Sequence, residues 1–344
     1  MFERPIWWDG DDVVVIDQTR LPHQATTVRW RTLEDAATGI ADMQVRGAPL
    51  IGVAAAHGMA LALAADPDAV AASADRLVAT RPTAVNLRWA LDRVRAEVAD
   101  LPVDARGAAA RRLAEQMADD DVRACRSIGE AGLDLIEAHH QRTGRPVQVM
   151  THCNAGWLAC VEWGTATAPV YLAHQAGIPV HVWVSETRPR NQGASLTAWE
   201  LGHRGVPHTV VVDNAAGHLL RTGAVDLVVV GADRVAANGD VANKVGTYLK
   251  ALAARDCGIG FHGAAPTSTY DAACPDGDAI PIEERDPDEV LTFGGTRVAP
   301  EGSPARNWGF DVTPARLVDS YLTDRGALTA DELPAAMQAT PEPA

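Results

Sequence analysis

Short apolar segments alternate with stretches of helical composition through the second half of the chain. Five segments after residue 146 have the length and β-branched content of buried strands: 147–152, 180–186, 208–214, 226–234 and 257–265. Strands that are covered on both faces are apolar throughout, so these segments predict a mainly parallel sheet between two layers of helices. The pattern indicates a Rossmann-like, doubly wound α/β domain.

The preceding residues predict a smaller, mostly helical domain with a few strands. Residues 12–17 and 26–30 are rich in β-branched residues and predict two paired strands. Thr32 and Asp35 have the spacing of a capping box and predict the start of a helix. The run after Pro49 is dense in Ala, Leu and Val, which indicates a buried helix.

A long helix is expected over residues 106–140, and its middle contains the expected domain boundary. We therefore predict a helical domain over 1–122 and a catalytic domain over 123–330. The Pro- and Ala-rich end of the chain, 331–344, predicts a loose tail.

Charge and cysteine content exclude several classes of function. The 344 residues carry a net charge of −15 without a run of Lys or Arg, which argues against binding to nucleic acid or to an anionic membrane. The first residues lack the apolar core of a signal peptide, and no apolar run reaches the ~20 residues of a membrane span. The five cysteines match no zinc spacing, so we expect reduced thiols, a cytoplasmic protein and no metal.

Cys153 is the leading candidate for chemistry. It follows the buried strand 147–152 directly and precedes a helix-like stretch that opens at Gly156. The N-terminus of a helix favours a thiolate or a bound anion, so we expect Cys153 to be reactive. A buried structural cysteine is the alternative interpretation.

Asp233 and the stretch Arg46-Gly47-Ala48 are further candidates. Asp233 ends an apolar strand, where burial favours a general acid or base, with a helix cap or an ion pair to Arg234 as the alternative. Arg46, Gly47 and Ala48 precede the buried helix, so its first N–H groups and Arg46 predict an anion site.

Four more polar residues lie at expected turns. Arg81 stands at a junction between two helices, and Gln192 lies in the polar segment 186–194 after a strand. Asn243 and Lys244 precede a helix in a Gly- and Asn-rich stretch and are expected to bind a hydroxyl group and a phosphate. For Lys244 and for the loop 186–194 the alternative is an ordinary solvated surface.

Several long motifs in the same order resemble one known family. Residues from about 17 to about 322 carry VRGAPLIGVAAAHG, RPTAVNLRWAL, THCNAGWLA, ETRPRNQGASLTAWEL, DNAAGHLL and GADRVAANGDVANKVGTY. Together they are similar to the 5-methylthioribose-1-phosphate isomerases. The wider family includes ribose-1,5-bisphosphate isomerases and the regulatory subunits of translation initiation factor 2B.

The resemblance implies an aldose–ketose isomerase of methionine salvage, without a cofactor, that forms homodimers. It implies that 5-methylthioribose 1-phosphate is converted to 5-methylthioribulose 1-phosphate. Cys153 and Asp233 match the family's catalytic pair. The residues that match the family's phosphate- and sugar-binding positions are Arg46, Gly47, Ala48, Arg81, Gln192, Asn243 and Lys244.

Rival functions remain open from the sequence. Arg190-Asn191 replaces a bulky apolar residue that is common in the family, so 5-deoxyribose 1-phosphate is an alternative substrate. Ribose 1,5-bisphosphate would require a further basic cluster. A regulatory subunit without turnover is the rival from another class, although such subunits lack the Cys and Asp pair. A nicotinamide oxidoreductase is disfavoured because G-x-G-x-x-G occurs only inside the last expected strand.

Overall fold

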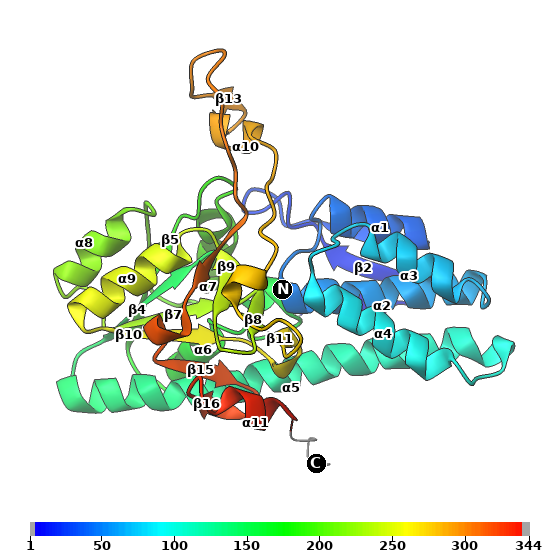
Figure 1. Cartoon of the computed structure of the whole chain (residues 1–344), viewed down its shortest axis with the longest axis horizontal. Coiled ribbons are helices and arrows are strands. Elements are labelled where there is room, and N and C mark those ends of the chain that lie inside the picture. The colour runs from blue at the N-terminus through cyan, green and yellow to red at the C-terminus, as the bar shows by residue number, and fades with distance from the viewer. Residues whose placement is uncertain (1–3, 339–344) are drawn as a thin grey trace.

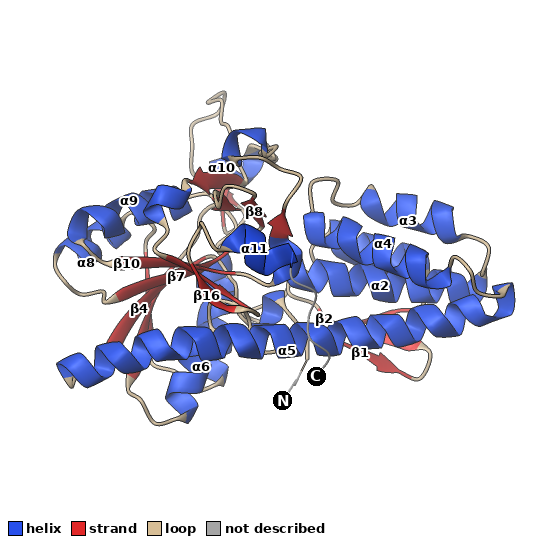
Figure 2. Ribbon diagram, turned by 60° about the horizontal axis from the view of Figure 1, so that its bottom comes forward, coloured by secondary structure: helices blue, strands red, loops and turns tan. Residues whose placement is uncertain are grey.

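The computed structural model describes residues 4–338. A helical part and a sheet part lie side by side, and one long helix runs along both of them (Figures 1 and 2). The two expected domain types are therefore present in the order that the sequence indicated.

The helical part begins with a small antiparallel sheet of three strands, β1 (Ile6–Asp9), β2 (Asp12–Ile16) and β3 (Thr27–Trp30). Strands β2 and β3 confirm the expected pair, whereas β1 was not predicted. Thr32 accepts from the backbone N–H of Asp35 and the Asp35 carboxylate accepts from the N–H of Thr32, which confirms the capping box.

Four helices follow this sheet: α1 (Leu33–Ala41), α2 (Ala48–Ala65), α3 (Val70–Val78) and α4 (Val85–Val98). Helix α2 lies against the other three and against the long helix α5. Within the described residues α2 alone has the length and apolar composition of a membrane span, but 78% of it is buried inside the protein. It is the core helix of this part.

Helix α5 (Val103–Thr143) is 41 residues long and packs on both parts of the molecule. The expected boundary after residue 122 falls inside this continuous helix. It ends at Gly144, which adopts the left-handed conformation that commonly terminates helices.

The sheet part is built on seven strands in the order β16-β15-β10-β7-β4-β5-β6. Six are parallel, and only the edge strand β16 runs antiparallel. The strands are β4 (Val147–His152), β5 (Val180–Ser185), β6 (His208–Val211), β7 (Leu227–Gly231), β10 (Gly260–Ala264), β15 (Ser320–Thr323) and β16 (Gly326–Leu328). The five expected strands are confirmed, and β15 and β16 are additional.

Helices cover both faces of this sheet. Helices α5 and α6 (Ala168–Gln175) lie on one face, and α8 (Ala215–Arg221) and α9 (Thr247–Cys257) lie on the other (Figure 2). A short π-helix, Gly193–Thr197, continues into α7 (Ala198–His203) beside β5 and β6. This layering confirms the doubly wound α/β prediction.

A second small sheet and a projecting segment complete the C-terminal region. The four-stranded sheet has the order β11-β8-β9-β14, with β8 (Arg234–Ala236), β9 (Val241–Lys244), β11 (Tyr270–Asp271) and β14 (Phe310–Thr313). Helix α10 (Asp288–Leu291) and the hairpin of β12 (Thr292–Phe293) and β13 (Thr296–Arg297) project from the body (Figure 1).

The end of the chain differs from the expected loose tail. Residues Leu333–Gln338 form helix α11, and the Leu333 side chain is buried in the core around β7 and β10. Residues 339–344 of the expected tail lie outside the described residues.

The helix expected after Cys153 is wrong. Only a short 3-10 turn, Trp157–Ala159, follows, and α6 begins at Ala168. Gly164 has a φ of +77° and folds the chain back so closely that a Cβ there would lie 2.3 Å from the Gly156 backbone. Cys153 therefore does not precede an α-helix N-terminus.

Candidate active site

Cys153 and Asp233 lie beyond the carboxyl ends of two neighbouring strands. β4 and β7 pair in parallel, and Cys153 follows β4 while Asp233 lies two residues beyond β7. After β4 the chain adds β5 and β6 on one side, and then β7 and β10 on the other. Ligands bind at such switch points in open α/β sheets. Both residues line one small cavity together with Arg46.

Cys153 sits in a strained turn that its neighbours hold in place. Its φ is +62°, a left-handed conformation that is costly for a residue with a side chain. The Thr187 hydroxyl oxygen accepts from the Cys153 N–H at 2.8 Å, and the Thr197 hydroxyl donates to the Cys153 carbonyl at 2.7 Å. Two threonines thus fix the backbone on both sides of the thiol.

His152 precedes the thiol but brings no positive charge to it. Its ring is buried, and Nε2 lies 2.8 Å from the carbonyl of Val245, so Nε2 carries the proton that it donates. Burial lowers the pKa of His152 to about 3. His152 is therefore neutral and packs the strand end against the segment after β9.

Burial and the neighbouring positive charges shift the pKa of Asp233 in opposite directions. Burial raises its pKa, while the positive charges of Lys244, Arg46 and Arg81 oppose that rise. Asp233 thus holds a proton to higher pH than an ordinary aspartate, which suits a general acid. Arg234, its neighbour in the sequence, forms an ion pair with Asp271 at 3.4 Å.

The N-terminus of α2 forms the opposite wall of the cavity. Gly47 has a φ of +100°, and a Cβ there would lie 2.5 Å from that of Ala159, so only glycine fits. Arg46 donates to both the side-chain and the main-chain oxygen of Asn154, the latter at 2.9 Å. Arg46 is therefore tied to the turn that carries Cys153, and Gly47 and Ala48 line the same cavity.

Lys244 and Asn243, at the end of β9, face this region. Lys244 is half-buried, donates to the carbonyl of Gly309 at 2.7 Å and lies 4.7 Å from the ring centre of Phe310. Burial lowers its pKa, and Cys153 and Asp233 oppose this change. Lys244 is thus not an ordinary exposed lysine. Asn243 is buried and lines the cavity that holds Cys153.

Arg81 lines a second cavity, which meets the first at Ala48 and Asp233. Its guanidinium lies 3.8 Å from the carboxylate of Glu283. The two cavities measure about 40 and 30 Å³. Small-molecule sites usually offer several hundred Å³, so both cavities are small for a sugar phosphate.

Gln192 lines neither of the two cavities. Its side-chain oxygen and that of Asn191 are buried without a hydrogen-bond partner in the described part of the chain. Arg190, beside them, is paired with Glu289 at 3.1 Å rather than simply solvated. Of the seven expected binding residues, five line the two cavities, namely Arg46, Gly47, Ala48, Arg81 and Asn243. Lys244 lines neither cavity, but its charge acts on Asp233.

Sequence reasoning missed the residues that hold the Cys153 turn. Thr187, Thr197 and Glu200 are completely buried, and Asn154 is nearly so. A signal was present, because Thr197 and Glu200 are polar residues in the otherwise apolar stretch SLTAWEL. Buried polar groups need partners, and such isolated positions point to a network.

Three side chains that could bind a metal ion lie close together around Cys160. The ligand atoms of Asp121, Cys125 and Cys160 all lie within 4.8 Å of one another. The Asp121 carboxylate already accepts from the N–H of Val161 at 2.7 Å, and burial raises its pKa to about 7. The expectation of no metal stays a prediction, and this cluster is where it can be tested.

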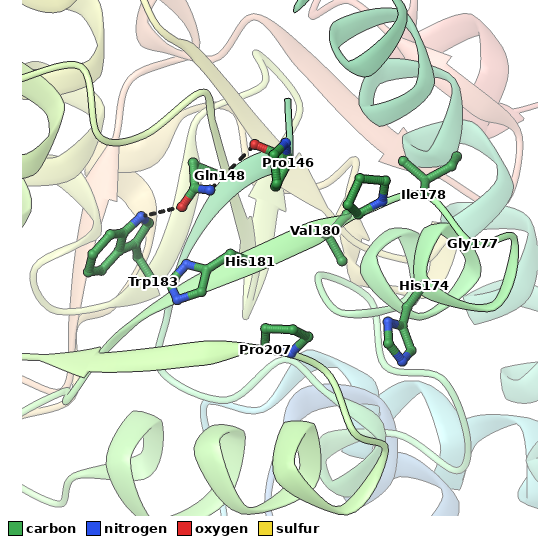
Figure 3. A pocket seen from close by; sticks show the side chains of 10 residues that line it. Pro146, Gln148, His174, Gly177, Ile178, Val180, His181, Trp183 and Pro207 are labelled. Carbon is green, nitrogen blue, oxygen red and sulfur yellow. Dashed lines mark hydrogen bonds between the residues drawn. The ribbon is translucent and has the colours of Figure 1, made fainter. Parts of the chain in front are cut away.

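A much larger hollow, of about 600 Å³, lies at the opposite end of β4 and β5 (Figure 3). Its wall is mostly apolar, and Trp183 donates to the side-chain oxygen of Gln148 there at 3.1 Å. None of the expected site residues lines it. The lining residues are Pro146, Gln148, His174, Gly177, Ile178, Pro179, Val180, His181, Trp183 and Pro207.

Comparison with known proteins shows the family of the chain. The model of the Initiation factor 2 subunit family matches residues 44–330. Methylthioribose-1-phosphate isomerase from Rhodospirillum centenum is 57% identical over 344 residues, covering 96% of this chain and 92% of the relative. The enzyme of the same name from Rhizobium meliloti is 54% identical, covering 93% and 92%.

Two solved structures share the whole fold. The 5-methylthioribose 1-phosphate isomerase from Pyrococcus horikoshii superimposes with a TM-score of 0.89 at 38% identity, covering 98% of this chain and 97% of the other. The delta subunit of translation initiation factor eIF-2B from A. fulgidus gives 0.85 at 36% identity, covering 98% and 100%. The chain therefore belongs to the Initiation factor 2 subunit family and, within it, to the methylthioribose-1-phosphate isomerases.

Proposed function

We propose that this protein converts 5-methylthioribose 1-phosphate to 5-methylthioribulose 1-phosphate in methionine salvage, with Cys153 and Asp233 as its catalytic pair. The observation that carries the assignment of residues is their convergence. Two groups that can transfer protons follow adjacent parallel strands at the switch point and line one cavity with Arg46, and the charges of Arg46, Arg81 and Lys244 act on Asp233.

The basic residues and α2 would hold the phosphate. The first N–H groups of an α-helix have no partner within the helix, and α2 presents them beside Gly47 and Ala48. Arg46, Arg81 and Lys244 supply the positive charge that a phosphate dianion requires. The chain has a net charge of −15, so this local concentration of cations stands out from its surroundings.

Asp233 would donate a proton to the ring oxygen of the sugar as the ring opens. The phosphate on C1 prevents the free aldehyde from forming, so ring opening must be assisted. Burial raises the pKa of Asp233, which favours the protonated form that this step requires. Cys153 then moves a proton from C2 to C1, or the pair polarises the substrate while a hydride moves between these carbons. In both routes the C2 hydroxyl group becomes the ketone and returns its proton to the Asp233 carboxylate.

Substrate entry would require these small cavities to widen. Glu283, which pairs with Arg81, and Gly309, which accepts from Lys244, belong to the segment that leaves and re-enters the body around α10. Gln192 contacts the sugar in this proposal, and its buried side-chain oxygen without a partner supports a role in binding.

The test is turnover of 5-methylthioribose 1-phosphate beside 5-deoxyribose 1-phosphate, followed by phosphorus NMR, for the wild type and Cys153→Ala. We expect the wild type to convert the methylthio sugar and the mutant to lose this activity. The ratio of the two rates measures the discrimination at C5, where loss of apolar contact alone is worth about 1–3 kcal/mol. Binding of both sugars without turnover would support the regulatory alternative.

We also propose that the protein is a cytoplasmic homodimer. Strand β6 forms an edge of the large sheet, and Val210 and Val212 are exposed on and beside it. Uncovered sheet edges with apolar side chains favour association. All five cysteines are free, which supports a reducing compartment. Light scattering after gel filtration should give twice the chain mass, and a monomer at micromolar concentration would contradict the dimer.

A further inference from the structure

The turn that carries Cys153 rests on a side chain from another element. Glu200, on α7, is completely buried, and its carboxyl group lies beneath the segment from Asn154 to Leu158. The Asn154 side-chain amide donates to one carboxyl oxygen at 3.2 Å, and the Leu158 N–H donates to the other at 3.2 Å. The carboxyl group thus holds both ends of this segment.

Gly156 shows how closely the backbone approaches this carboxyl group. A Cβ at Gly156 would lie 1.2 Å from a carboxyl oxygen of Glu200, so no other residue fits without displacement. Trp157, the next residue, packs against Trp199 of α7 with ring centres 5.9 Å apart. The segment therefore contacts α7 at both Gly156 and Trp157.

Asn154 links this support to the phosphate-binding arginine. Its side-chain NH₂ donates to Glu200 and also to the Thr197 hydroxyl at 3.1 Å, while its two oxygens accept from Arg46. Thr197 in turn donates to the Cys153 carbonyl. One connected network therefore joins Glu200 to both Arg46 and Cys153.

We propose that Glu200 is a positioning residue, which fixes the Cys153 thiol and the Arg46 guanidinium relative to each other through Asn154. It does not line the cavity, so it acts through the groups that do. This inference rests on the proposed roles of Cys153 and Arg46. It assigns a function to a buried acid that the reaction itself does not use.

Ionisation of Glu200 should make KM depend on pH. Burial raises its pKa to about 8, so the group is mainly neutral at pH 7 and ionised at pH 9. The other titratable or charged groups that face it are Arg46, Arg204, Tyr171 and Cys160. An ionised Glu200 offsets the charge of Arg46 and weakens its attraction for a phosphate dianion.

The experiment measures KM and kcat from pH 7 to pH 9, where a sugar phosphate remains a dianion. For the wild type we expect KM to rise severalfold over this range. For Glu200→Gln we expect KM to stay flat and kcat to fall about tenfold, because only one of the two N–H donors keeps an acceptor. Glu130→Gln, at an exposed ion pair on α5, is the matched control and should follow the wild type.

The outcomes separate the two levels of the proposal. A Glu200→Gln variant with the wild-type kcat and the wild-type rise in KM would overturn the positioning role, while the isomerase assignment would stand. Full activity of Cys153→Ala would instead overturn the catalytic pair. If Glu200→Gln does not fold, as judged by near-ultraviolet circular dichroism, Asn154→Ala tests the same link, and wild-type kcat and KM in that variant overturn the proposal.

Discussion

The larger hollow lies at one end of the large sheet, and the candidate reactive groups lie at the other end. At the amino ends of β4 and β5 lies the open, apolar hollow of about 600 Å³. At the carboxyl ends of β4 and β7 lie two small cavities of 30 to 40 Å³, lined by a thiol, a carboxyl group and several cations. The larger hollow is lined mostly by apolar residues, and none of the expected site residues lies there.

This difference indicates that the candidate active site is recognised by reactive side chains that lie close together, and not by the volume of a cavity. The carboxyl end brings together segments that are more than one hundred residues apart, such as Arg46 and Asn154. Arg46 and Lys244 there each donate a hydrogen bond, and Asp233 has charged neighbours. The following experiments test whether catalysis is confined to that end.

The largest expected effect is the loss of catalysis on removing either member of the pair. Cys153→Ala and Asp233→Asn should each lower kcat by about 10³-fold, because general acid–base groups contribute factors of that order. His181→Ala, in the wall of the large hollow, should leave kcat unchanged. Loss of activity in His181→Ala with full activity in Cys153→Ala would reverse the comparison between the ends.

A smaller effect is expected at the phosphate site. Arg46→Met removes a charge next to the proposed phosphate and both hydrogen bonds to Asn154, so kcat/KM should fall about 100-fold. Arg221→Met, at an exposed position on α8, is the control for the loss of one positive charge. Equal kinetics for the two variants would refute the role of Arg46.

Stability against pH should report on the buried carboxyl group of Asp121, on α5 beside Cys160. Burial raises the pKa of Asp121 from 3.8 to about 7, so the folded state retains a proton that the unfolded chain releases. The contribution of this group is complete below the ordinary pKa and is lost as pH rises toward 7. Asp121→Asn should flatten the decrease in melting temperature between pH 5 and pH 8. An unchanged decrease would show that Asp121 is ionised in the fold.

The smallest expected effect is that of chelation. Activity measured after dialysis against EDTA and phenanthroline should equal that of the untreated protein, and mass spectrometry should find less than one metal ion per chain. Retained metal that disappears in Cys125→Ser would assign it to the cluster with Asp121 and Cys160. Loss of activity on chelation would contradict the prediction of no metal.

The sequence by itself determined the architecture and named the central pair as candidates. Apolar strand segments and their spacing predict a parallel sheet, because such a pattern can be buried only between helices. Position at strand ends made Cys153 and Asp233 candidates, since the carboxyl ends of parallel strands meet at one edge, and the resemblance to the family matched them to a catalytic pair. The composition of the run after Pro49 predicted the buried helix α2. The glycine in Arg46-Gly47-Ala48 indicated a close backbone approach just before that helix.

Only the tertiary structure decided how these residues are held and charged. The helix expected after Cys153 failed because Gly164 and Gly156 pack backbone on backbone, a contact that local propensity does not encode. The raised pKa of Asp233 and the neutral His152 follow from burial by elements distant in the chain. Glu200 appeared as one polar residue in an apolar stretch, and its partners became visible only when α7 was placed beneath the turn, because hydrogen bonding depends on distances that folding creates.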